Sequence, residues 1–131
     1  GRTRPFTHNT SLTVDDRLGL ANGDPQDAYQ SFFSGHAAAA FALATLMSTV
    51  YTDIHGRSTA SDLLWASSLS VAGFTAYARV KAGMHYPSDV LVGAAVGSAI
   101  GLAVPWLHRA GERAPVDVAA GPGGVVVRLR H

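Results

Sequence analysis

Cysteine is absent from the 131 residues of this chain, which excludes disulfide frameworks, thiolate nucleophiles and cysteine-ligated zinc sites. Charged residues are scarce as well: Asp, Glu, Lys and Arg make up 15% of the chain, and the formal net charge is +1. A charge this close to zero provides no basic surface for nucleic acid by bulk electrostatics. We therefore expect no nucleic-acid partner.

The few charges are also unevenly distributed, because three long segments contain none: residues 37–52, 63–78 and 90–107. Segments of this length lie at the lower edge of the about 20 apolar residues that a membrane-crossing helix requires. The third segment carries Gly93, Gly97 and Gly101, a spacing of small residues that lets helices approach closely in membranes. The sequence thus favours membrane-embedded helices over the alternative, a tightly packed soluble bundle.

Three long helices account for most of the chain, and we predict them over residues 35–51, 60–80 and 87–107. Ser34 is well suited to cap the first helix, and Pro87 to open the third. Pro105 is expected to kink or end the third helix, because proline lacks the N–H that an interior position requires. The predicted fold class is an all-α helical bundle.

The remaining segments are polar or rich in glycine and proline. We predict one short helix over residues 14–20 and a connector over 52–59. Residues 1–108 form the predicted core, and for the tail 109–131 we expect either disorder or a short strand over 125–130. The chain begins without a methionine or a signal-peptide pattern, so we expect it to be the C-terminal half of a larger bundle.

Two segments far apart in the sequence, 34–36 and 79–89, carry side chains suited to binding an anion. The first opens a predicted helix, whose unpaired N–H groups and positive dipole end attract negative charge. Arg79 adds a planar fork of donors that matches phosphate oxygens, and Arg4 can add a second. Together they predict a site for one tetrahedral anion.

Two histidines in these segments can do chemistry on such an anion. His85 and Asp89 are four residues apart, so the carboxylate can accept from one ring nitrogen and leave the other as a nucleophile or base. His36 is placed to act as an acid towards a leaving oxygen. A metal triad of these three residues is the alternative, but it leaves Arg79 without a role.

The pattern resembles the type 2 phosphatidic acid phosphatase superfamily, which also contains bacterial acid phosphatases and vanadium-dependent haloperoxidases. The motifs of this family are Lys-x6-Arg-Pro, Pro-Ser-Gly-His and Ser-Arg-x5-His-x3-Asp. Arg4-Pro5 matches the end of the first motif, and Ser34-Gly35-His36 matches the second after its proline. The third motif is matched with both spacings intact by Arg79, His85 and Asp89. The resemblance covers roughly residues 4–101.

The resemblance implies a metal-independent phosphatase that hydrolyses a phosphomonoester or diphosphate, lipid-linked if the helices lie in a membrane. His85 would be the nucleophile that forms a phosphohistidine, Asp89 its orienting partner, and His36 the acid and then the base. The phosphate cradle would consist of Arg4, Ser34, Gly35 and Arg79. No cofactor is expected. The alternative within the family is a haloperoxidase, which would hold vanadate in the same pocket.

Three positions depart from the family pattern. The lysine of the first motif would precede Gly1, Phe33 stands in place of the proline, and Ala78 in place of the serine. Because the lysine supplies a cation to the anion site, we expect an upstream segment or a second chain to provide it. A chain without that lysine would be a non-catalytic membrane module that retains the fold.

The basic residues at the helix ends predict an orientation. Arg4, Arg79 and Lys81 would lie at the end with the anion site, and Arg57, Arg109 and Arg113 at the opposite end. Because both ends are basic, the positive-inside rule only weakly favours a cytoplasmic position for the second end. The expected location is therefore the cell membrane, with the site facing the periplasm or the extracellular space. The alternative is a soluble periplasmic protein.

Overall fold

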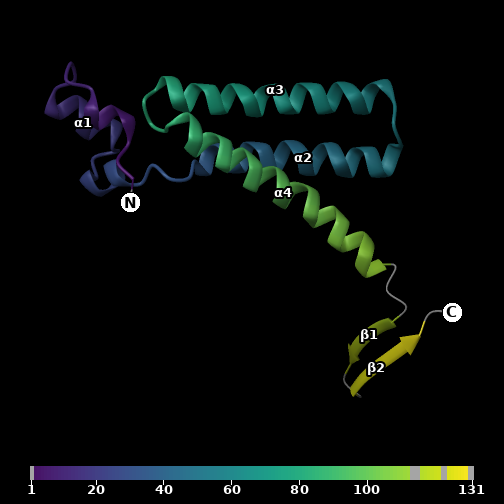
Figure 1. Cartoon of the computed structure of the whole chain (residues 1–131). Coiled ribbons are helices and arrows are strands. Elements are labelled where there is room, and N and C mark those ends of the chain that lie inside the picture. The colour runs from purple at the N-terminus through teal and green to yellow at the C-terminus, as the bar shows by residue number, and fades with distance from the viewer. Residues whose placement is uncertain (1, 113–115, 122–123, 130–131) are drawn as a thin grey trace.

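Three long helices form the body of the molecule (Figure 1). They are α2 (Gly35–His55), α3 (Thr59–Lys81) and α4 (Pro87–Glu112). The α2 and α3 helices run antiparallel, and α4 crosses α2 obliquely and packs chiefly against it. This computed structural model describes the backbone of residues 2–112, 116–121 and 124–129, and the side chains of residues 2–109. The predicted helical bundle is confirmed.

A small cap precedes the bundle. It contains α1 (Val14–Leu20), with the predicted bounds, and two short 3-10 helices, η1 (Pro5–His8) and η2 (Pro25–Tyr29). Its apolar core joins Phe6 and Ala21 to Met84 from the loop between α3 and α4. The N–H of Phe6 also donates to the Gly83 carbonyl over 2.9 Å. The cap is therefore fixed to the end of the bundle where the third motif lies.

Two helix ends differ from the prediction. The α2 helix runs on to His55 and ends at Gly56, whose φ of 75° is a conformation that glycine adopts easily, so the connector is shorter than 52–59. The α4 helix continues through Pro105 to Glu112. Proline removes one bond, the one to the Gly101 carbonyl, and the intact bonds on either side carry the helix past it.

A two-stranded antiparallel hairpin follows α4 in the chain. Its strands are β1 (Val116–Gly121) and β2 (Gly124–Leu129), with Val116 opposite Leu129. The strand predicted over 125–130 is confirmed as far as Leu129, whereas Arg130 lies outside the described residues, as does Arg113. The first residues of the predicted tail, up to Glu112, belong to α4.

The contact between α4 and α2 depends on three glycines spaced four residues apart. A Cβ on Gly93 would lie 2.5 Å from the Ser34 carbonyl oxygen, and one on Gly97 would overlap the backbone of Ala38. Gly101 is packed against α2 in the same way. The two backbones are thus in direct contact, which places the start of α2 beside the start of α4.

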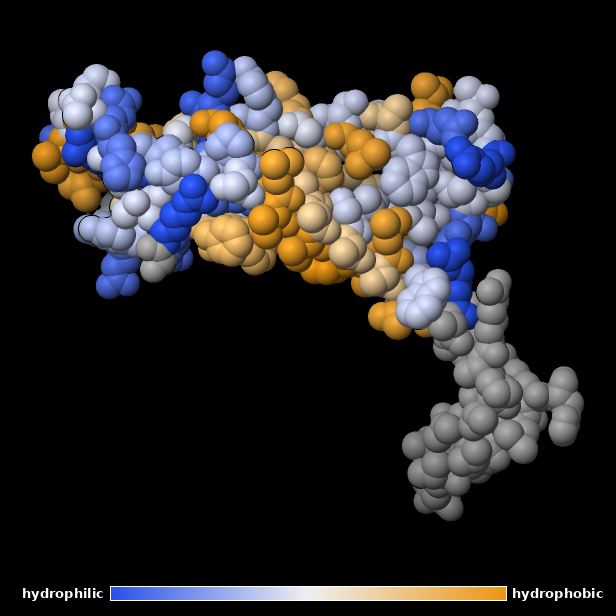
Figure 2. Space-filling model, viewed as in Figure 1, coloured by the Kyte–Doolittle hydropathy of each residue, from blue (hydrophilic) through white to orange (hydrophobic). Residues whose placement is uncertain are grey.

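The surface of the bundle is strongly apolar. Two helical segments, Gly35–His55 and Pro87–Arg109, are long and apolar enough to cross a membrane. Figure 2 shows apolar side chains running across the bundle on the face in view. The most exposed large ones on the three helices include Leu43, Met47, Ile54, Leu63, Val71, Phe74, Leu91 and Ile100. An exposed apolar surface of this kind fits contact with lipid and supports a membrane-embedded bundle.

The glycine contact yields a stability prediction. Gly97→Ala should lower the unfolding free energy by about 1–3 kcal/mol, because its methyl group has to displace the backbone of α2. Gly73→Ala in α3 is the matched control, since no atom lies within 4 Å of its Cβ position. Thermal unfolding in detergent measures the stability of the two variants. Equal melting temperatures for the two variants would contradict the proposed contact.

Candidate active site

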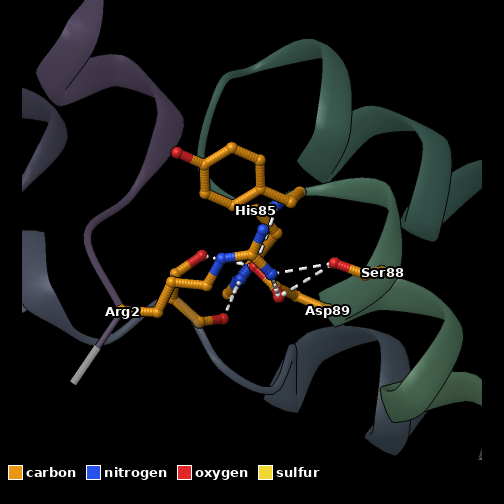
Figure 3. A network of polar contacts seen from close by, with 6 residues as sticks. Arg2, His85, Ser88 and Asp89 are labelled. Carbon is orange, nitrogen blue, oxygen red and sulfur yellow. Dashed lines mark hydrogen bonds and ion pairs between the residues drawn. The ribbon is translucent and has the colours of Figure 1, made fainter.

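Asp89 is the most highly connected side chain at the motif end of the bundle (Figure 3). It lies in the first turn of α4 and is fully buried. One carboxylate oxygen accepts from the Ser31 hydroxyl over 2.5 Å and from the Tyr86 N–H over 3.0 Å. The other accepts from the Arg2 guanidinium over 2.6 Å. These donors compensate the charge that burial would otherwise destabilise.

The backbone of Asp89 connects the third motif to the second. Its carbonyl accepts from the Ser34 N–H over 3.1 Å. Ser34 is fully buried and caps α2 as predicted, with its Oγ accepting from the Ala37 N–H over 3.4 Å. Gly35 follows, with open space at its Cβ position. The helix end predicted to bind an anion therefore begins directly beside Asp89.

His85 lies in the loop just before α4, and only 4% of its surface is exposed. Its Nδ1 is 2.7 Å from the Ser31 carbonyl oxygen. Because a carbonyl can only accept, Nδ1 must carry the proton, which leaves a lone pair on Nε2. The prediction that Asp89 accepts from this ring is wrong. His85 precedes the helix, so the four-residue spacing spans a turn instead of one helical face.

The surroundings of His85 favour the neutral form of its imidazole. Burial lowers the pKa of His85, and the positive charges of Arg4 and Arg79 lower it further. The bond to the Ser31 carbonyl and the charge of Asp89 act in the opposite direction, and the net shift of the pKa is downward. A neutral imidazole with a free Nε2 is the form that can attack an electrophile.

Two arginines near His85 retain unpaired donors. Arg4 is buried, donates from Nη2 to Asp27 over 2.7 Å, and lies 3.7 Å from the Met84 sulfur. Its Nε has no hydrogen-bond partner, and neither does the buried Nε of Arg79 in the last turn of α3. Buried donors without partners are rare in proteins. Guanidinium donors of this kind suit an oxyanion, although Arg17 Nε in α1 is also buried without a partner.

His36 differs from His85 in its exposure. It is the second residue of α2 and is accessible to solvent. Its helix end is held to α4 by the bond between Ser34 and Asp89. Within the described residues, no group of three or more His, Asp or Glu side chains is arranged to hold a metal ion. His36, His85 and Asp89 therefore do not form the alternative metal triad.

Two site residues, Arg2 and Ser31, were not predicted from the sequence. Arg2 donates to Ser88 over 2.8 Å as well as to Asp89, and its guanidinium lies 3.9 Å from the centre of the Tyr86 ring. Neither residue belongs to a motif, and small polar residues such as Ser31 are common in turns. No signal in the sequence distinguishes them, because their role depends on the fold around them.

The site can now be compared with known proteins. A family model described as the PAP2 superfamily matches residues 1–113. The chain belongs to the PAP2 superfamily. The second and third motifs of this PAP2 chain meet at one end of the bundle, where the Ser34 N–H donates to the Asp89 carbonyl. Arg4, from the end of the first motif, lies beside Met84 at the same end.

One similar protein is the lipid A 1-phosphatase of Porphyromonas gingivalis, which is 39% identical over 80 residues. These residues make up 61% of the PAP2 chain and 17% of that protein. The match therefore covers less than a fifth of the relative's own length. No solved structure gives a significant match.

The charges around His85 yield a prediction about its titration. Arg79→Met should raise the pKa of His85, because it removes a positive charge that opposes the imidazolium form. In the unaltered protein, the pKa should lie below the ordinary value of about 6.5. NMR titration of the His85 ring protons measures this pKa in the unaltered protein and in Arg79→Met. Arg57→Met, at the other end of α2 and α3, is the control and should leave the pKa unchanged.

Proposed function

We propose that this chain forms the catalytic part of a membrane phosphatase that releases phosphate from a phosphomonoester or diphosphate group on a lipid. The observation that carries the proposal is the buried His85, whose Nδ1 is bound to a carbonyl and whose pKa is lowered, near two arginines with unpaired donors. The family and the name of the lipid A 1-phosphatase relative support the same class of reaction.

In the first half of the reaction, His85 Nε2 attacks the phosphorus and forms a P–N bond. The P–O bond to the leaving group breaks, and His36, entering as the imidazolium, gives its proton to the leaving oxygen. The charge that develops on the phosphoryl oxygens is stabilised by Arg79 and Arg4, and by the N–H groups at the helix end of Ser34 and Gly35.

In the second half, the neutral His36 takes a proton from water, and the resulting hydroxide attacks the phosphorus. The P–N bond breaks, phosphate leaves, and His85 returns to its neutral form while His36 becomes imidazolium again. Asp89 keeps His85 in place in both halves. The residues proposed here supply the charge stabilisation without a metal ion, together with the family's motif lysine from an upstream segment or a second chain.

A membrane location determines which substrates can reach the site. If α2 and α4 cross the bilayer, the site lies at a membrane surface, where the phosphate of a lipid head group is found. Arg57 and Arg109 lie at the other end of the bundle, where they line a cavity of about 460 Å³. Basic residues lie at the site end as well, Arg79 and Lys81 among them. The orientation proposed here places the Arg57 and Arg109 end in the cytoplasm and the site towards the periplasm or the extracellular space.

The two histidines provide a direct test. His85→Ala and His36→Ala should each lower phosphate release from phosphatidic acid micelles by about a thousandfold or more, because each removes a group that makes or breaks a bond. His55→Ala, the same substitution at the far end of α2, is the control and should keep full activity. Unchanged phosphate release by His85→Ala would rule out the phosphohistidine route.

Vanadate distinguishes a phosphatase from a haloperoxidase. It should inhibit phosphate release in competition with the substrate, because it resembles the phosphoryl group in the transition state. EDTA should leave the rate unchanged. Halide oxidation by peroxide in the presence of vanadate would favour the haloperoxidase instead, and strong inhibition by EDTA would indicate a metal site.

A further inference from the structure

Ser31 lies between Asp89 and His85 in the hydrogen-bonded network of the site. It is fully buried, although the phenylalanine residues 32 and 33 that follow it are exposed. Each of its polar groups has a partner: the hydroxyl donates to Asp89 over 2.5 Å, the carbonyl accepts from His85 Nδ1 over 2.7 Å, and the N–H donates to the Arg2 carbonyl over 3.0 Å.

The hydrogen-bonded path from Asp89 to His85 runs through this serine. The carboxylate of Asp89 accepts hydrogen bonds from Ser31, Tyr86 and Arg2. None of these three donors belongs to the His85 ring. The His85 ring, in turn, is oriented by the Ser31 carbonyl. Ser31 is thus the residue whose hydroxyl contacts Asp89 and whose carbonyl contacts the His85 ring, while Asp89 also holds the backbone next to His85 through the Tyr86 N–H.

We propose that Ser31 is a positioning residue of the reaction, whose hydroxyl, anchored on Asp89, holds its own carbonyl where it fixes the tautomer and direction of the His85 ring. The inference rests on the proposed function, because it concerns the nucleophile of that reaction. A mutation can remove the hydroxyl of Ser31 and leave in place the carbonyl that contacts His85.

Ser31→Ala keeps the carbonyl and removes only the anchor. The segment that carries the carbonyl is then free to shift, and Nε2 loses its alignment with the phosphorus. A misplacement of this kind costs about a hundredfold in rate. Binding of the phosphate should change little, because the donors of Arg79 and of the α2 helix end remain in place.

The kinetic test uses the natural full-length protein in detergent with phosphatidic acid micelles. Ser31→Ala should lower kcat by about 10- to 100-fold and leave KM within twofold. Ser31→Thr, which keeps the hydroxyl, should recover most of the loss. In an Asp89→Asn background, Ser31→Ala should cost much less than in the unaltered protein, because the two residues act as one unit.

Ser48 provides the matched control. It is equally buried, and its hydroxyl lies 2.9 Å from that of Ser68, between α2 and α3. Ser48→Ala makes the same chemical change in the bundle core, so it should lower stability and leave kcat unchanged. Equal kcat values for Ser31→Ala and the unaltered protein, or independent effects of Ser31→Ala and Asp89→Asn, would overturn the inference.

A second measurement does not require activity. In protein labelled with ¹⁵N-histidine, the nitrogen shifts of His85 should show a proton fixed on Nδ1, and this proton should exchange slowly with water. Ser31→Ala should speed the exchange and populate the other tautomer, whereas Ser48→Ala should do neither. Unchanged spectra for Ser31→Ala would overturn the inference even if no substrate is hydrolysed. Altered spectra in a protein without phosphatase activity would show that Ser31 orients the His85 ring and would reject the proposed function.

Discussion

The buried carboxylate of Asp89 is the interaction on which the motif end of this protein depends. Its side chain takes hydrogen bonds from the N-terminal segment, from the segment before α2 and from the loop just before α4, and its carbonyl takes one from Ser34. A buried charge requires such partners, because an unpaired carboxylate would cost several kcal/mol. Satisfying this one group therefore fixes three chain segments relative to one another.

The glycines of α4 allow this arrangement. Gly93 lies one turn after Asp89, and a side chain there would push the Ser34 carbonyl away. Because the two helix backbones touch, the first turn of α2 and the first turn of α4 meet at one place. The same close packing leaves the large apolar side chains on the outside, where a bilayer can receive them (Figure 2). The close packing of α2 against α4 therefore also brings the site residues together.

Much of the fold could be predicted from the sequence, because its signals are local. The charge-free runs, the cap at Ser34 and the proline at position 87 gave the three helices to within a few residues. The end of α2 at Gly56 was missed because glycine is also common in connectors. The continuation of α4 beyond residue 107 was missed because a proline signals a break locally, whereas helix continuation depends on all the bonds around it.

The sequence by itself singled out the residues proposed to carry the chemistry: His36, His85, Arg79 and Asp89, by type, order and spacing. Only the tertiary structure decided how they are connected. The spacing of His85 and Asp89 suggested a direct contact, but the chain turns between them, and Ser31 and Arg2 occupy the positions around the carboxylate. Such contacts join residues more than fifty positions apart. They arise from the need to satisfy one buried charge, which no local pattern encodes.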